Sequence, residues 1–216
     1  MLAIIGAGGH ARAAYGCFHA SHQAVCGFFD DDISQHGSEV IDGLHVIGSP
    51  SSILDREEIK SIFVAIGDNL VRLRQYEYFK GKGYLLPDAL HPRSYISSFS
   101  KTGSGMFLMG ASIINPAAAV DDYCIINTSA TVGHDCKLGR AVQIAPGVNI
   151  GGGTVLEEGV FVGIGAKIAP GLRIGAWSVV GAGAVVLDDV PAEVFVCGIP
   201  AAVKKRLPSP DRQDRG

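Results

Sequence analysis

The feature that most constrains the fold is a six-residue hydrophobic period in the second half of the chain. Starting at Ile96, every sixth residue is aliphatic in fifteen of sixteen positions, and Thr102 is the exception. An α-helix repeats about every 3.6 residues and an ordinary strand about every 2, so neither explains this spacing. A period of six is typical of short strand-and-turn units that stack into a solenoid with their aliphatic side chains inside.

The other positions of the six-residue unit fit the same stacking. The fourth residue after the aliphatic one is usually small, as at Ala118 and Ala166, and glycine often follows the aliphatic residue directly, as at Gly133. Small residues fit a crowded corner, and glycine tolerates the backbone conformations of tight turns. Three units per coil give about five coils of parallel β-helix, with about 4.8 Å between coils.

The first 92 residues follow a different pattern. Apolar runs at 2–5, 24–29 and 61–66 predict buried strands, and the segments 10–20, 51–60 and 70–82 predict helices. Strands that alternate with helices favour an α/β fold with a parallel sheet, here half of a doubly wound (Rossmann) domain. We therefore predict a βαβ domain over 1–92, a β-helix over 93–191 and a C-terminal tail over 192–216, disordered from 207 onward.

Composition excludes several other classes. The net charge is −3, and the only basic cluster, at residues 204–206, gives little support for nucleic-acid binding. No apolar run is long enough for a transmembrane helix, and we expect no secretory signal. The five cysteines show no C-x-x-C spacing, so we expect neither disulfides nor a metal site, and a cytoplasmic location.

Motifs in both halves together resemble one enzyme family. They are Gly6-Ala-Gly-Gly-His10-Ala11, Ala65-Ile-Gly-Asp-Asn69, His91-Pro92, the stretch from Asn127 to Cys136, and Gly198-Ile-Pro200-Ala201. This combination resembles the sialic acid O-acetyltransferase-type nucleotide-sugar acetyltransferases, which include UDP-4-amino-sugar and GDP-perosamine N-acetyltransferases. The resemblance covers nearly the whole chain. It implies a left-handed β-helix of hexapeptide repeats, a homotrimer, acetyl-CoA as co-substrate in the groove between neighbouring prisms, no metal, and a role in bacterial glycan synthesis such as that of lipopolysaccharide.

His134 is the strongest catalytic candidate. The core of such a prism accepts aliphatic and small residues, so a histidine in a turn points outward. An amine or hydroxyl that attacks a thioester must lose a proton, and an imidazole with a pKa near neutrality suits that role. The resemblance implies that the adjacent Asp135 orients the ring, although a solvated surface charge is the alternative.

The first glycine-rich segment is a candidate phosphate-binding loop. Gly6-x-Gly8-x-x-Ala11 lies between a predicted strand and a predicted helix, where backbone N–H groups donate hydrogen bonds to a phosphate. Asp30, about 20 residues further on, also fits a dinucleotide site, although half a fold leaves little room for a whole dinucleotide. The resemblance implies that the nucleotide sugar is bound by Gly8, Gly9, His10, Asp30, Asp31, Gly67, Asp68, Asn69 and Asn127. Asn127 is otherwise a turn residue.

The acetyl-CoA site depends more heavily on the resemblance. Gln143 stands where some relatives carry a second histidine that contacts the acetyl group, and Ile164 and Ala182 stand where relatives hold the pantetheine arm through backbone groups. A backbone N–H such as that of Gly152 or Gly153 would then stabilise the oxyanion. Cys136 could also be read as a nucleophile, but its small-residue position predicts a buried, inert thiol.

Three functions remain open from the sequence. The first is direct acetyl transfer from acetyl-CoA to the amine of a nucleotide-linked amino sugar, with His134 as general base. The second is O-acetylation of a free sugar of the sialic acid type. The third is a non-catalytic nucleotide-sugar or dinucleotide sensor with a structural β-helix.

Overall fold

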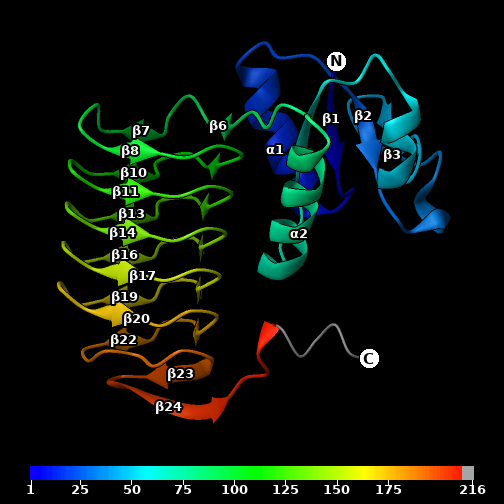
Figure 1. Ribbon diagram of the computed structural model, residues 1–216. Helices are drawn as coiled ribbons and strands as arrows, with labels where there is room; N and C mark the ends of the chain where they lie inside the picture. The colour runs from blue at the N-terminus through cyan, green and yellow to red at the C-terminus, as the bar shows by residue number, and fades with distance from the viewer. Residues whose placement is uncertain (211–216) are drawn as a thin grey trace. The chain divides into compact units, whose positions relative to one another are not determined.

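The computed structural model describes residues 1–210, so the part of the disorder prediction that concerns 211–216 lies outside the described residues. The chain divides into two compact units, and the boundary lies between Pro92 and Arg93 (Figure 1). Neither helix of the described residues has the length and apolar character needed to cross a membrane.

The first unit is built on a three-stranded parallel sheet in the order β2-β1-β5. Every residue of the central strand β1 is buried, which explains its uninterrupted apolar sequence. The elements of this unit are β1 (Leu2–Ile5), α1 (Gly9–Ala20), β2 (Val25–Phe29), η1 (Ile33–Gln35), β3 (Glu39–Ile41), β4 (Leu44–His45), η2 (Pro50–Asp55), β5 (Ser61–Val64), α2 (Asn69–Gly81) and β6 (Ala89–Leu90).

The helix predicted over 51–60 is instead the short 3₁₀ helix η2, which ends at Asp55. The backbone turns after it, because the N–H of Ile59 donates to Arg56 O at 3.0 Å and the N–H of Lys60 donates to Met1 O at 3.1 Å. These bonds already direct the chain into β5, so no helix continues through this segment.

The carboxyl ends of the three strands meet closely. The N–H of Gly6 donates to Phe29 O at 2.7 Å, and the N–H of Ala65 donates to Ile5 O at 2.8 Å. Gly6 has a φ of +101°, and a Cβ there would lie 2.8 Å from Ala65 O. Glycine is therefore required at this position, because it lets the loop after β1 pack directly on the loop after β5.

The second unit is a solenoid of two-residue strands that form three parallel sheets (Figure 1). We call these the first face (β7, β10, β13, β16, β19, β22), the second face (β8, β11, β14, β17, β20) and the third face (β9, β12, β15, β18, β21 and the longer β23, Val194–Gly198). The strands are β7 (Tyr95–Ile96), β8 (Lys101–Thr102), β9 (Phe107–Leu108), β10 (Ile113–Ile114), β11 (Ala119–Val120), β12 (Ile125–Ile126), β13 (Thr131–Val132), β14 (Lys137–Leu138), β15 (Gln143–Ile144), β16 (Asn149–Ile150), β17 (Val155–Leu156), β18 (Phe161–Val162), β19 (Lys167–Ile168), β20 (Arg173–Ile174), β21 (Val179–Val180) and β22 (Val185–Val186).

The repeat places side chains as the sequence predicts. Val132 pairs with Ile150 on the next coil, and both aliphatic side chains are buried. The small residues Ala130 and Cys136 are buried at the corners. We call the turns between the first and second faces the first edge, and the turns between the third and first faces the third edge.

The segment predicted as a tail from residue 192 is largely ordered. It forms β23 (Val194–Gly198), which pairs in parallel with β21, and β24 (Ala201–Arg206), which pairs with β23 in antiparallel fashion. Val194 and Val196 are buried, so alternate residues of β23 cover the end of the solenoid core. The prediction missed this hairpin because the six-residue period stops before it.

Candidate active site

His134 lies on the first edge, in the turn between β13 and β14, with 71% of its side chain exposed. Its Nδ1 is 2.7 Å from Asp135 Oδ2. Asp135 has a φ of +57°, and its N–H donates to Pro116 O at 3.2 Å. This left-handed turn brings two adjacent side chains together, which residues in an extended strand would not achieve.

The contact with Asp135 defines how the imidazole functions. A carboxylate accepts hydrogen bonds and donates none, so in the neutral imidazole Nδ1 carries the hydrogen and Nε2 keeps its lone pair. The ring lies against Gly152 on the next coil, where a Cβ would be 2.5 Å from Nε2. Glycine at 152 therefore leaves the space that the ring occupies.

One backbone donor lies beside this ring. The N–H of Gly153 donates to His134 O at 2.8 Å, so it is not available to a ligand. The N–H of Gly152 has no acceptor among residues 1–210. Pro116 and Pro170, one coil before His134 and one coil after Gly152, have no N–H. Of Gly152 and Gly153, only Gly152 therefore has an N–H without an acceptor among residues 1–210.

The residues predicted for the sugar and the pantetheine arm lie on the third edge. Asn127 follows β12, and its Oδ1 accepts a hydrogen bond from the N–H of Thr128 at 2.8 Å, as a turn residue does. Ile164 is 58% exposed. In the described part of the chain, the N–H groups of Ile164 and Ala182 have no acceptor and can bind a ligand.

Gln143 lies on β15 in the third face, between Ile125 and Phe161 of the neighbouring strands. Its Oε1 is buried and has no hydrogen-bond partner in the described structure. A buried amide oxygen without a donor costs stability, so a donor from a ligand or a second chain would be favourable here.

The predicted solenoid residues therefore lie apart in a single chain. His134 and Gly152 are on the first edge, whereas Asn127, Ile164 and Ala182 are on the third edge, with the first face between them. No turn of one chain brings these two groups together.

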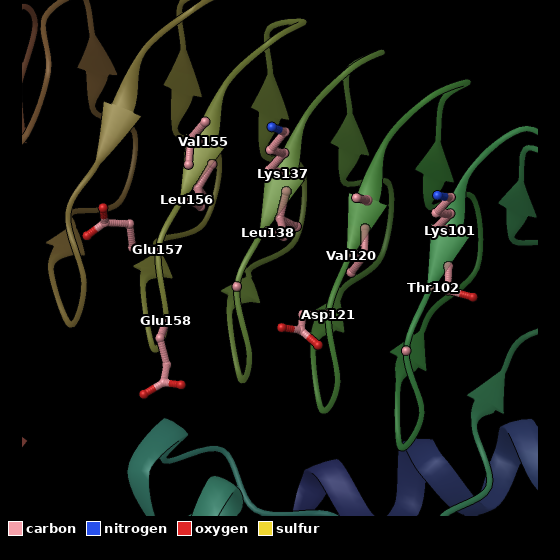
Figure 2. A pocket seen from close by; sticks show the side chains of 13 residues that line it. Lys101, Thr102, Val120, Asp121, Lys137, Leu138, Val155, Leu156, Glu157 and Glu158 are labelled. Atoms are coloured by element: carbon pink, nitrogen blue, oxygen red, sulfur yellow. The ribbon is translucent and has the colours of Figure 1, made fainter.

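The second face carries a hollow of about 580 Å³ that contains none of the predicted site residues. Figure 2 shows Lys101 and Lys137 along one side of it, and Asp121, Glu157 and Glu158 along the other. The face thus changes from basic to acidic across its width, over an apolar floor that includes Leu138.

In the first unit, the amino terminus of α1 is open. Gly8 is the N-cap and makes no side-chain capping bond, and Gly9 is the first helical residue. A Cβ on either glycine would meet no atom within 4 Å. The start of the helix, with the positive end of its dipole, thus has open space beside Gly8 and Gly9 that suits an anion.

His10 lies in the first turn of α1. Its burial, and secondly the charge of Arg72, lowers the pKa of His10 from 6.5 to about 4. The imidazole is therefore neutral at pH 7, and the positive helix terminus favours the same state.

This pKa predicts how stability depends on pH. The unfolded chain binds a proton at His10 near pH 6.5, but the folded chain does so only near pH 4. Stability is therefore lost as the pH falls through this window, by up to about 3 kcal/mol. Urea unfolding from pH 7 to 4 should show a steeper loss for wild type than for His10→Gln. An equal loss in the two proteins would contradict the assignment.

The acidic residues of this unit mainly shape its loops. Asp30 accepts hydrogen bonds from the N–H groups of Ala7 and Asp32, both at 2.9 Å. Asp68 is the N-cap of α2 and accepts from the N–H of Val71 at 2.9 Å. These carboxylates therefore hold the backbone beside the site and have fewer free lone pairs for a ribose than the sequence implied.

Gly67, Asn69 and Asp31 complete the predicted set. A Cβ on Gly67 would meet no atom within 4 Å, and Asn69 Oδ1 accepts a hydrogen bond from Arg72 at 2.8 Å. The exposed Asp31 borders a hollow of about 460 Å³, whose other lining residues are Pro50, Ser51, Arg74, Gln75, Tyr78 and Phe79. The structure thus brings the eight predicted residues of this unit to the carboxyl edge of one sheet. Arg72 is a residue of this edge that the sequence analysis missed.

Cys136 is fully buried, and its Sγ donates to Gly151 O at 3.2 Å. Burial raises the pKa of this thiol, so a thiolate nucleophile is disfavoured.

We expect Cys136→Ala to change kcat by less than about twofold, because an inert thiol adds only packing. Steady-state assays of CoA release test this, and a large loss of kcat in a folded variant would restore the nucleophile interpretation.

No group of three or more His, Cys, Asp or Glu side chains within residues 1–210 could hold a metal ion.

Comparisons with known proteins add to this geometry. The PglD N-terminal domain family matches residues 1–79, and the bacterial transferase hexapeptide family (six repeats) matches residues 153–188. PerB from Caulobacter crescentus, solved with CoA and GDP-perosamine, is 35% identical, with a TM-score of 0.89 over 94% of this chain and 97% of that one. The chain belongs to the hexapeptide-repeat nucleotide-sugar acetyltransferases.

Two further solved structures are similar to this chain. The acetyltransferase domain of PglB from Neisseria gonorrhoeae, solved with acetyl-CoA, is 32% identical, with a TM-score of 0.86 over 94% of this chain and 98% of that one. WeeI from Acinetobacter baumannii, at 24% identity and a TM-score of 0.86 over 94% and 99% of the two chains, supports the fold alone. Comparison with curated proteins finds no match. The predicted fold, an α/β unit followed by a left-handed β-helix, is confirmed.

Proposed function

We propose that this acetyltransferase transfers the acetyl group of acetyl-CoA to the amino group of a nucleotide-linked amino sugar. The observation that carries the proposal is the His134 ring, exposed on the first edge and held by Asp135 at 2.7 Å. Its Nε2 lies against Gly152, whose N–H has no acceptor among residues 1–210. A base and an oxyanion donor side by side are what acyl transfer to an amine requires.

The chemistry follows from these groups. The neutral sugar amine attacks the thioester carbonyl, and its proton passes to His134 Nε2. Asp135 stabilises the imidazolium through Nδ1–H, and the N–H of Gly152 stabilises the negative oxygen of the tetrahedral intermediate. As the intermediate collapses, the C–S bond breaks and the imidazolium returns the proton to the CoA thiolate. Holding both substrates together would supply much of the rate, and no acyl-enzyme forms.

The first unit would hold the nucleotide. The open amino terminus of α1, at Gly8, Gly9 and His10, suits the diphosphate. The hollow beside Asp31, at about 460 Å³, is large enough for a nucleobase. PerB was solved with GDP-perosamine, which supports a nucleotide sugar as the substrate class.

The active enzyme would be a homotrimer. His134 and Gly152 lie on a different edge of the prism from Asn127, Ile164 and Ala182, so one chain does not contain a whole site. If the first edge of one copy meets the third edge of the next, each groove receives both sets, and a closed ring satisfies all copies. Gln143, on the third face, would then find its missing donor at such a groove.

Subunit mixing tests this arrangement. His134→Ala and Ala182→Trp should each be inactive alone, because one removes the base and the other fills the groove. Co-refolding equal amounts should restore about a quarter of the wild-type activity, because about one groove in four then combines two intact edges. If the mixture remains inactive while wild type refolds under the same conditions, the shared site is refuted.

Substrate class is tested by CoA release with acetyl-CoA and a panel of acceptors. We expect turnover with GDP-perosamine or a UDP-4-amino-sugar, on the order of 1 s⁻¹ or faster. The matching free amino sugars should react far more slowly, because they lack the nucleotide anchor. Turnover with free sialic acid instead would support the O-acetyltransferase alternative. The cytoplasmic location and the role in glycan or lipopolysaccharide synthesis remain predictions.

A further inference from the structure

A buried arginine lies beneath the loop that follows β5. Arg72, in the first turn of α2, is only 1% exposed. Its Nη1 donates to Ile66 O at 3.1 Å and to Gly67 O at 3.3 Å, and its Nη2 donates to Asn69 Oδ1 at 2.8 Å. One side chain therefore bonds to two carbonyl groups of the loop after β5 and to the first residue of α2.

These bonds determine which side of the loop faces outward. The carbonyl oxygens of Ile66 and Gly67 point inward to the guanidinium. A Cβ on Gly67 would meet nothing within 4 Å, so the loop has open space beside Gly67. The planar guanidinium can bond several oxygens in fixed directions at once, which the single ammonium of lysine cannot do.

The chain at the end of β5, just before the loop that Arg72 shapes, also contacts the loop that leads from β1 into α1. Ala65 O would lie 2.8 Å from a Cβ on Gly6, so the two loops have little freedom to shift independently. The charge of Arg72 also acts at this place, since it contributes to the lowered pKa of His10 in the first turn of α1. A positive charge held in the low-dielectric interior strengthens the attraction of this edge for an anion.

We propose that Arg72 is a positioning residue for the nucleotide end of the substrate, holding the loop from Ile66 to Asn69 against the amino terminus of α1 so that both meet one nucleoside diphosphate. This inference depends on the proposed function, because that function assigns the nucleotide to this edge. Arg72 would act through the loop and not through direct contact, because its own side chain is buried.

The test compares the binding of GDP, UDP and CoA to full-length wild type, Arg72→Lys and Arg72→Met by isothermal titration calorimetry. We expect Arg72→Met to bind the preferred diphosphate at least about tenfold more weakly than wild type. Arg72→Lys should also bind it more weakly, because lysine restores the charge but cannot bond several oxygens in fixed directions at once. CoA should bind all three proteins equally. Lys80→Met, which removes an exposed charge from the same helix, should match wild type.

Each outcome has a defined meaning. Wild-type affinity for the diphosphate in folded Arg72→Lys and Arg72→Met would overturn the inference, and so would parallel losses of CoA and diphosphate binding. If Arg72→Met does not fold, Arg72→Lys decides alone, with melting temperature as the check on folding. A wild-type protein that binds neither GDP nor UDP would instead refute the nucleotide site of the proposed function. In turnover, the KM for the nucleotide sugar should rise in Arg72→Lys while kcat stays unchanged.

Discussion

Replacing His134 with alanine should lower kcat by about 10²- to 10⁴-fold, because the attacking amine then loses its proton without a positioned base. The KM values should change little, since the exposed ring is assigned a role in proton transfer and not in binding. Asp135→Asn should cause a smaller loss, because it keeps the turn but removes the negative charge 2.7 Å from Nδ1. Steady-state kinetics of CoA release measure both effects.

The matched control for His134 is His45→Ala, which removes an exposed histidine of the first unit from β4. It should retain wild-type kcat. Undiminished turnover by His134→Ala would mean that this imidazole is not the base, and it would favour a binding role for the β-helix.

Replacing Gly152 with alanine should lower kcat by about 10²-fold, an effect as large as the loss of one oxyanion donor. The new Cβ would lie 2.5 Å from both Nε2 and Cε1 of His134, so the ring must leave its position. The backbone of Gly152 does not have a positive φ, so alanine introduces no conformational strain and the β-helix should remain folded.

Gly16→Ala is the control for this second substitution, because a Cβ on Gly16 in α1 would meet no atom within 4 Å. Its melting temperature should equal or exceed that of wild type, since alanine favours a helix, and its kcat should be unchanged. A Gly152→Ala protein with wild-type kcat would show that the ring position seen here is not the catalytic one.

The β-helix could be predicted from the sequence because its signal is periodic. Residues such as Val132 and Ile150 recur at a fixed spacing, and the same spacing puts them in the buried column of the structure. The hairpin after residue 192 has no such signal, since Val194 and Val196 alternate over only a few residues. Short strands of this kind form because they cover the last coil of the solenoid. Their position follows from that tertiary contact, and no local sequence pattern predicts it.

The candidate site could be predicted only in part. The sequence placed His134 in a turn, but its contact with Asp135 depends on a φ of +57°, which no composition rule supplies. Whether the N–H of Gly152 is free depends on how the coils stack. The sequence alone does not show that Pro116 and Pro170 occupy the equivalent turns of neighbouring coils. Nothing in the sequence pointed to Arg72, because the residue lies in a segment that reads as an ordinary amphipathic helix. Its proposed role depends on carbonyl groups of the loop after β5 that point toward the guanidinium, and only the structure shows these.

The most direct test of His134 as the general base is a crystal structure of the enzyme with CoA and an amino-sugar nucleotide such as GDP-perosamine. We expect the sugar nitrogen to lie about 2.6–3.2 Å from His134 Nε2. The CoA sulfur should lie in the same groove, near the N–H of Gly152. A sugar nitrogen bound far from His134, or a CoA sulfur outside the groove at the first edge, would contradict it.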